Sequence, residues 1–151
     1  MKAILQRCRD AAVTIDGETV GTCAHGLMIL LGVFKGDETA DADLLAAKIA
    51  KLRIFDDVDG KLNLSVKDVQ GSALVVSNFT LCADYRKGNR PDYFASEAPA
   101  RAEELYEYFA AALRAQGLHV ECGRFGADMK VSLINDGPVT IDMDSNLLKK
   151  S

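Results

Sequence analysis

Residues 25–34 read His-Gly-Leu-Met-Ile-Leu-Leu-Gly-Val-Phe, and this stretch decides the fold. From Leu27 to Phe34 apolar side chains follow one another without alternation, which is typical of a strand buried on both faces. The run is much shorter than the ~20 apolar residues of a transmembrane helix. It therefore predicts a central strand with other elements packed on both sides of it.

The segment before this strand predicts a β-hairpin. Residues 3–5 and 13–15 have the aliphatic and β-branched side chains of strands. Asp16-Gly17 is a strong signal for a two-residue hairpin turn, and residues 18–22 would form the returning strand. The N-terminal part of the chain is therefore expected to be β-structure.

Two other segments have helical spacing. Apolar residues recur every three or four positions between 40 and 54, after the acidic and capping residues of 37–39. A second helix is predicted from Pro99, because proline is tolerated at the first helical position, and Gly117 is its natural stop. These two helices interrupt the β-structure of the chain.

The remaining apolar stretches predict further strands: residues 73–76, 119–123, 129–134 and 139–143. The chain shows no repeat, linker or low-complexity stretch, so residues 1–151 are expected to form a single domain. Strands interleaved with two main helices predict an α+β fold. Its sheets should be mostly antiparallel or mixed, and barrel-like.

The net charge limits the kinds of molecule that the protein is expected to bind. The formal net charge is −4, which argues against non-specific binding of nucleic acid over a broad basic face. One local basic cluster is present, made of Arg86, Lys87 and Arg90. A solvated loop is the plainer interpretation of this cluster, and a contact with RNA is the alternative.

Composition and cysteine usage indicate an intracellular protein. The chain is 48% hydrophobic and 26% charged, as globular proteins are, and no segment predicts a signal peptide or a membrane span. We therefore expect a cytoplasmic protein in which the four scattered cysteines are reduced thiols. No motif requires a metal ion or an organic cofactor.

Two polar segments stand out because they interrupt apolar strands. Ser77-Asn78-Phe79-Thr80-Leu81 ends a predicted buried strand and places two hydroxyls and an amide beside an aromatic ring. Residues 135–140, Asn-Asp-Gly-Pro-Val-Thr, separate two predicted strands and contain a glycine that permits close backbone approach. Each segment alone is also compatible with a plain strand end or a hairpin turn. The usual catalytic motifs are not visible, and His25 and His119 are interpreted as structural or exposed.

Together the two segments resemble the signatures of the D-aminoacyl-tRNA deacylases, first known as D-tyrosyl-tRNA deacylases. Those signatures are Ser-Gln-Phe-Thr-hydrophobic and Asn-x-Gly-Pro-(Val/Phe)-Thr. Further stretches similar to family segments occur in the same order, so that the resemblance covers nearly the whole chain: 6–7, 30–33, 53–55, 86–91 and 123–129. One departure is Asn78, where the family usually has Gln.

The resemblance implies a hydrolase that needs no cofactor and frees D-amino acids from D-aminoacyl-tRNA as a proofreading step of translation. It also implies a homodimer in which the Gly137–Pro138 loop, with a cis peptide bond, crosses into the partner's site. Backbone carbonyls of this loop would bind the α-ammonium group, so that a D-side chain points outward and an L-side chain clashes. Glycyl-tRNA, which has no side chain to reject, is expected to be a second substrate.

The resemblance assigns roles to particular residues. Those expected at the reaction are Ser77, Asn78, Phe79 and Thr80. Those expected to bind the substrate or support the loop are Gly137, Pro138, Arg7, Phe125 and Met129. Those expected to bind tRNA are Arg86, Lys87 and Arg90. Two alternatives stay open, which are a surface salt bridge for Arg7 and plain core packing for the aromatic and methionine side chains.

The mechanism and the class of protein also have alternatives. Backbone N–H groups near Phe79 and Thr80 are candidate donors to the oxyanion. Thr80 is a candidate nucleophile, but a hydroxyl needs a base, so we favour assistance by the 2′-hydroxyl of the terminal adenosine of tRNA. The competing classes are a non-catalytic tRNA-binding module and an esterase for small D-amino acid esters.

Overall fold

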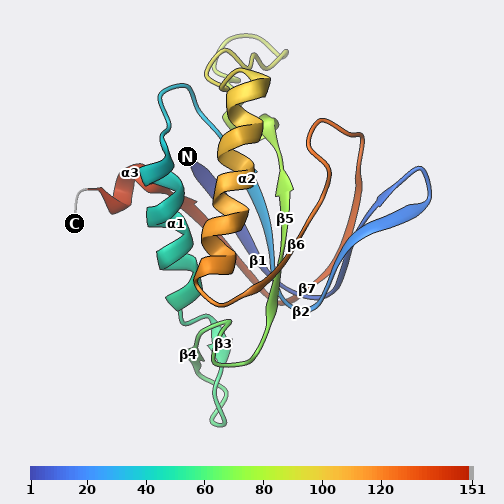
Figure 1. The fold of residues 1–151 in the computed structure, drawn as a ribbon, viewed down its shortest axis with the longest axis vertical. Coiled ribbons are helices and arrows are strands. Elements are labelled where there is room, and N and C mark those ends of the chain that lie inside the picture. Colours follow the sequence, from blue (N-terminus) through green and yellow to red (C-terminus); the bar gives the residue numbers. More distant parts are fainter. Residues whose placement is uncertain (150–151) are drawn as a thin grey trace.

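The structure, a computed structural model, describes residues 1–149 of the chain. Two main helices cover one face of a curled, mixed five-stranded sheet (Figure 1). The predicted α+β fold is confirmed, with the strand order β6-β5-β2-β1-β7. Because β6 and β7 are the two edges, no hydrogen bonds between described strands close the predicted barrel-like sheet. Residues 150 and 151 of the predicted domain lie outside the described part.

The elements of the main sheet are β1 (Lys2–Ile15), β2 (Glu18–Gly32), β5 (Ser72–Ser77), β6 (His119–Cys122) and β7 (Lys130–Asp144). A separate pair consists of β3 (Phe55–Asp56) and β4 (Leu62–Leu64). The helices are α1 (Thr39–Lys51), the 3₁₀ turn η1 (Phe79–Cys82), α2 (Pro99–Ala115) and α3 (Ser145–Leu148). None of the described helices is both long enough and apolar enough to cross a membrane.

The predicted central strand is confirmed within β2. It pairs antiparallel with β1 and parallel with β5, so both of its edges are hydrogen-bonded. Leu27, Ile29 and Leu31 point into the core beneath the helices, whereas Met28 belongs to a smaller cluster on the opposite face. The run is apolar without alternation because each of its faces packs against other side chains.

The N-terminal hairpin is longer than the sequence indicated. β1 and β2 pair from Lys2 opposite Gly32 to Ile15 opposite Glu18, so the predicted short strands are parts of two continuous ones. Asp16 and Gly17 form the predicted turn with positive φ values of 50° and 81°, as in the twisted two-residue turns that join such strands. The backbone ladder thus continues through polar positions that broke the local hydrophobic pattern.

α1 begins as predicted and ends earlier. Glu38 caps it in a capping box with Asp41. The helix stops at Lys51, and Leu52 is extended with φ −64° and ψ 128°, although the helix was predicted to reach residue 54. The chain instead turns toward β3, because Phe55 pairs with Leu64.

β7 corrects a prediction. Residues 135–138 were predicted to break two strands, yet β7 runs through them as one strand. Cys8 of β1 pairs with Asn135 and Gln6 pairs with Thr140, so residues 136–139 bulge outward opposite Arg7. The segment is not a hairpin turn, because both of its flanks continue in the same direction along the same partner strand.

Candidate active site

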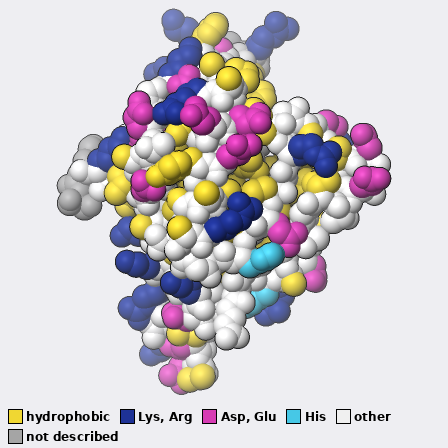
Figure 2. Space-filling model, in the orientation of Figure 1, with side chains coloured by type: hydrophobic (Ala, Val, Ile, Leu, Met, Phe, Trp, Pro, Cys, Tyr) yellow, Lys and Arg dark blue, Asp and Glu magenta, His cyan; other side chains and the backbone are white. Residues whose placement is uncertain are grey.

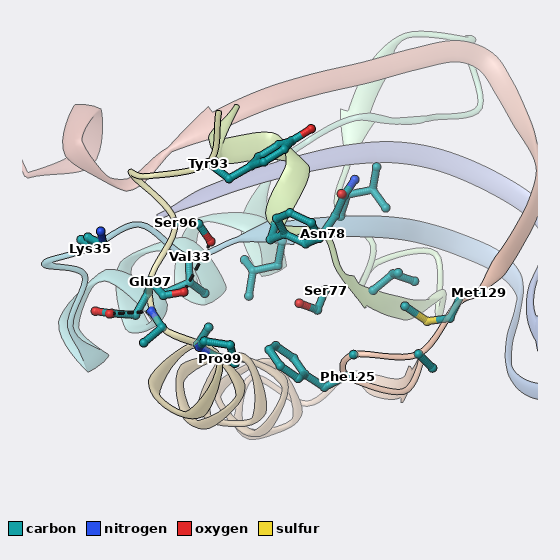
Figure 3. Close-up of a pocket in the computed structure, with 18 of the residues that line it drawn as sticks. Val33, Lys35, Ser77, Asn78, Tyr93, Ser96, Glu97, Pro99, Phe125 and Met129 are labelled. Carbon is teal, nitrogen blue, oxygen red and sulfur yellow. Dashed lines mark hydrogen bonds between the residues drawn. The ribbon is translucent and has the colours of Figure 1, made fainter. Parts of the chain in front are cut away.

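A pocket of about 860 Å³ lies beside the carboxyl end of β5 (Figure 3). Side chains of β2, β5 and the start of α2 form much of its wall, and the segment before β7 closes one side. Five of the residues predicted for the site line this pocket: Ser77, Asn78, Phe79, Phe125 and Met129. The fold thus brings together side chains from two segments that are far apart in the sequence.

The polar edge of the pocket forms where β5 ends. Ser77 is the last residue of β5 and pairs with Leu31. The N–H of Asn78 still donates to the carbonyl of Leu31 at 2.8 Å, after which the chain turns into η1. The sequence predicted that residues 77–81 end this strand without indicating a helix, so the 3₁₀ turn is a feature that only the structure shows. As the first residues of this turn, Phe79 and Thr80 have N–H groups without an intrahelical acceptor.

Asn78 and Thr80 interact through their side chains. The Thr80 hydroxyl donates to the amide oxygen Oδ1 of Asn78. Thr80 is exposed and does not line the pocket. Its proton is directed at an amide oxygen, which is too weak a base to activate a hydroxyl for attack.

The walls of the pocket are aromatic and apolar. Phe79 meets Tyr93 edge to face, with ring centroids 5.0 Å apart. Phe125 packs on the core beneath the helices, where its ring is 6.0 Å from that of Tyr106, and Met129 packs on the smaller cluster of the opposite face. Phe125 and Met129 therefore contribute to core packing and also line the pocket.

Some lining residues were missed by the sequence reasoning. Tyr93, Ser96 and Glu97 come from the loop between η1 and α2, and Lys35 follows β2. Figure 3 shows them on the side of the pocket opposite Met129. No local pattern distinguished them, and the one available signal, a position just after the basic cluster, applied to Tyr93, Ser96 and Glu97 but not to Lys35.

Arg7 lies beneath the β7 bulge and is only 7% exposed. Its Nε donates to the carbonyl oxygen of Asp136 at 2.8 Å, and its Nη1 donates to the carbonyl oxygen of Ile54 at 3.1 Å. Asp56, which is half exposed, adds an ion pair at 3.5 Å. The predicted contact with the loop is present, and the surface salt bridge considered as the alternative is a smaller part of the arrangement.

The bulge itself is held at its base. Asn135 Nδ2 donates to the Thr140 hydroxyl at 2.9 Å, and Asn135 Oδ1 accepts from the N–H of Val139 at 3.1 Å. The peptide bond between Gly137 and Pro138 is cis, as predicted. Gly137 has φ +141°, and an added Cβ would lie 2.8 Å from a Val139 methyl group, so only glycine fits here.

Within one chain the bulge does not reach the pocket. Arg7 pairs with Leu27 and Ser77 pairs with Leu31, four residues further along β2. Along the strands this offset amounts to ~13 Å, and across the sheet the three strand spacings from β5 to β7 amount to ~14 Å. The bulge and the carboxyl end of β5 are therefore roughly 20 Å apart. Neither Gly137 nor Pro138 lines the pocket.

The basic cluster lies at the tip of the loop that also supplies Tyr93. Asp84 and Asp92 form an isolated antiparallel bridge that closes this tip. Arg86 binds the Asp84 carboxylate through Nε and Nη2, and these hydrogen bonds lower the pKa of Asp84 to about 2. Lys87 and Arg90 are exposed, and none of the three cations lines the pocket.

No group of three metal-ligating side chains occurs within residues 1–149. His25 packs edge to face on Phe55, with centroids 5.6 Å apart, and His119 contacts Glu121 at 3.0 Å. Neither histidine lines the pocket. The polar side chains that line it carry the hydroxyls of Ser77, Tyr93 and Ser96, the amide of Asn78, the ammonium group of Lys35 and the carboxylate of Glu97.

Residues 4–144 match the family model described as D-Tyr-tRNA(Tyr) deacylase. The chain belongs to this deacylase family. Similar full-length relatives are the D-aminoacyl-tRNA deacylases of Ruegeria pomeroyi and Paracoccus denitrificans. The Ruegeria protein is 60% identical over 95% of this chain and 99% of its own length. The Paracoccus protein is 57% identical over 96% of this chain and 97% of its own length.

Solved structures show the same deacylase-family fold. A protein described as c-Myc DNA Unwinding Element Binding Protein aligns over 95% of this chain and 98% of its own, with a TM-score of 0.89 and 39% identity. A probable eukaryotic D-amino acid tRNA deacylase aligns over the same shares of the two chains, with a TM-score of 0.83. Its identity is only 15%, so this second likeness concerns the fold alone.

Proposed function

We propose that this protein hydrolyses the ester bond of D-aminoacyl-tRNA, which is a proofreading step of translation, in the cytoplasm. The observation that carries the proposal is the convergence of Ser77, Asn78 and Phe79 with Phe125 and Met129 on one pocket. The full-length relatives named as D-aminoacyl-tRNA deacylases support it. The terminal aminoacyl-adenosine would occupy this pocket, with the adenine against its apolar walls.

The reaction needs a group that stabilises the charge on the ester carbonyl as it is attacked. The N–H groups of Phe79 and Thr80 begin η1 without intrahelical acceptors and lie next to the pocket. A donor directed at the developing oxyanion typically contributes ~10²–10³ in rate. We assign this role to these two N–H groups.

The attacking water requires activation, and 2′-hydroxyl assistance fits the site better than a threonine nucleophile. Thr80 donates its proton to an amide oxygen, and neither histidine lines the pocket. The one carboxylate among the described lining residues, that of Glu97, already accepts a hydrogen bond from the N–H of Ala98 at 2.8 Å. The 2′-hydroxyl of the terminal adenosine is adjacent to the ester that breaks. In this mechanism the protein contributes position and polarisation rather than a general base of its own.

Selection against L-amino acids would come from a second copy of the chain. In the proposed homodimer, Gly137 and Pro138 of one protomer lie over residues 77–80 of its partner. The separation of roughly 20 Å within one chain supports this arrangement. Carbonyls of the loop would bind the α-ammonium group and leave no space for an L-side chain, so glycyl-tRNA would also be accepted.

The test is the release of tyrosine from D-Tyr-tRNA and from L-Tyr-tRNA by the purified protein in the presence of EDTA. Rapid loss of the D-ester, with the L-ester intact, is the expected result. Binding of tRNA without hydrolysis of either ester would instead favour a non-catalytic tRNA-binding module. Equal rates on D-Tyr-tRNA and on a D-tyrosine ethyl ester would favour a small-ester hydrolase.

A further inference from the structure

Two aromatic side chains outside the pocket are almost fully in solvent. Tyr85 is 76% exposed and Phe94 is 78% exposed, more than any other aromatic residue that the structure describes. Both belong to the loop between η1 and α2, at the upper end of the molecule in Figure 1. A group of exposed aromatic side chains on one part of a protein surface often marks a binding site.

These two residues belong to the same segment of the chain as two exposed aromatic residues of the pocket. Phe79 and Tyr93 lie at the pocket and are 57% and 37% exposed. Four of the five exposed aromatic residues described therefore fall between 79 and 94, and the fifth is Tyr108 on α2. The segment that carries these four rings joins the pocket, at Phe79 and Tyr93, to the tip of the loop between Asp84 and Asp92.

The tip is held in shape at its neck. Asp84 and Asp92 exchange two backbone hydrogen bonds, of 2.9 and 3.0 Å. Tyr85 follows Asp84 directly, and the N–H of Phe94 donates to the Asp92 carboxylate at 3.3 Å. The Lys35 N–H donates to the carbonyl of Ala95 at 2.9 Å and ties the loop to the end of β2. Both rings are thus attached to a fixed base although neither is buried.

The charge on the tip favours a polyanion. Residues 85–91 contain three cations and no carboxylate. Arg86 is paired with the Asp84 carboxylate at the neck, and Lys87 and Arg90 are exposed. Figure 2 shows Lys and Arg side chains beside hydrophobic ones at the upper end of the molecule. Cations interleaved with exposed aromatic rings suit single-stranded RNA, because the cations contact phosphates while the rings stack on bases.

We propose that Tyr85 and Phe94 stack on the unpaired bases that precede the terminal adenosine of tRNA, while Arg86, Lys87 and Arg90 contact the neighbouring phosphates. This inference rests on the proposed function, since that function places the terminal nucleoside in the adjacent pocket. The stacking is independent of base identity, so it serves any tRNA with an unpaired 3′ end. The small ester and the RNA chain are thereby recognised by separate parts of the protein.

The test replaces the rings with a side chain that is apolar but not flat. Tyr85→Leu, Phe94→Leu and the double variant are compared with Tyr108→Leu, which removes an exposed ring elsewhere. Binding is measured by fluorescence anisotropy with tRNA and with a short single-stranded RNA of the same 3′ sequence. Hydrolysis is measured with D-Tyr-tRNA and with 3′-O-D-tyrosyl-adenosine.

We expect each single substitution to weaken RNA binding roughly tenfold, because one base–ring stack contributes about this much. The KM for D-Tyr-tRNA should rise by a similar factor, while kcat/KM for the adenosine ester stays unchanged. The Tyr108 variant should behave as the wild type in both assays.

Two results would overturn the inference. One is a double variant that binds both RNAs as tightly as the wild type. The other is an equal loss on D-Tyr-tRNA and on the adenosine ester, which would show that the rings only support the pocket. If the wild type hydrolyses neither ester, the proposed function fails, and the binding comparison still decides whether this surface takes RNA.

Discussion

Arg7 is a buried cation whose closest partners are carbonyl oxygens, of Asp136 in the bulge and Ile54 near β3. A guanidinium group can reach two carbonyls in different directions, whereas an ammonium group at the end of a flexible chain cannot hold the same geometry. This one side chain therefore links the bulge of β7 to the segment that follows α1. Local sequence gives no indication of that link, because the partners lie 47 and 129 residues away.

We predict that Arg7→Lys lowers kcat/KM for D-Tyr-tRNA at least tenfold and the free energy of unfolding by about 1–3 kcal/mol, because a buried carbonyl loses its donor. The matched control is Arg9→Lys, since Arg9 is exposed and its side chain contacts the Asp136 carboxylate instead of a buried carbonyl. Steady-state kinetics and urea unfolding measure the two quantities. Wild-type activity in the Arg7 variant would show that the bulge needs no support from below.

The hydroxyl of Thr80 is a further test at this scale. We predict that Thr80→Ala keeps kcat within about tenfold of the wild type, because the hydroxyl donates to Asn78 and has no base. A 2′-deoxy terminal adenosine should slow cleavage by ~10² or more, as expected when a general acid–base group is lost. Single-turnover hydrolysis measures both rates. Normal cleavage of the deoxy substrate would contradict 2′-hydroxyl assistance.

Among the elements, β7 is defined by its bulge. We predict that Gly137→Ala abolishes most activity and destabilises the protein by more than ~2 kcal/mol, because the new Cβ would meet Val139 at 2.8 Å. Gly36→Ala is the control, since Gly36 also has a positive φ, +92°, but has open space around it. This substitution should lower the free energy of unfolding by only about 1 kcal/mol. Thermal unfolding compares the two. Equal losses of stability in the two variants would show that the positive φ alone, and not the contact with Val139, causes the destabilisation.

α1 and α3 are joined through Asp41, which is 1% exposed. Burial alone would raise its pKa, but hydrogen bonds from Lys149, the Glu38 N–H and Ser145 outweigh burial and bring the pKa to about 2. A carboxyl group whose pKa is lowered in the folded state stabilises the protein at pH values above the ordinary pKa of that group. That stability is lost as the pH falls toward 2.

We therefore predict that Asp41→Asn lowers the free energy of unfolding by about 2 kcal/mol at pH 7, and that the difference from the wild type shrinks between pH 4 and pH 2. Asp128→Asn is the control, because Asp128 is exposed and forms its ion pair with an exposed partner, Lys130. Urea unfolding at several pH values gives the comparison. A difference that stays constant down to pH 2 would mean that the charge of Asp41 is not what stabilises the helix.

On the scale of the whole molecule, the bulge and the pocket lie at different places on one chain. If they meet only across a two-fold dimer interface, two differently inactivated chains should complement each other. We predict that an inactive Gly137→Ala chain and an inactive Phe79→Ala chain, unfolded and refolded together, recover about a quarter of the wild-type activity. Half of the dimers would be mixed, each with one intact site.

The control for complementation is each variant refolded alone, which should stay inactive. Size-exclusion chromatography establishes the oligomeric state of every sample. Recovery in the mixture requires that one protomer supplies the loop and the other supplies the pocket. An inactive mixture that still contains mixed dimers would place both parts of the site within one protomer.

Elements that depend on neighbouring residues could be predicted from the sequence. The hairpin turn at Asp16-Gly17, the start of α2 at Pro99 and the central strand follow from local backbone preferences and from apolar runs. The two polar segments and their resemblance to a family were equally visible, and five of the site residues they named line one pocket. The short pair β3 and β4 was missed because strands of two or three residues have no periodicity to detect.

The sequence by itself determined the α+β class, the family and two of the polar side chains at the pocket, Ser77 and Asn78. Only the tertiary structure decided that β7 bulges instead of turning, that Arg7 holds the bulge from below, and that the bulge and the pocket are far apart within one chain. The physical reason is that the register of a β-ladder and the burial of a side chain depend on contacts between residues distant in sequence. A local pattern carries the preference of each segment but not the choice of its partner.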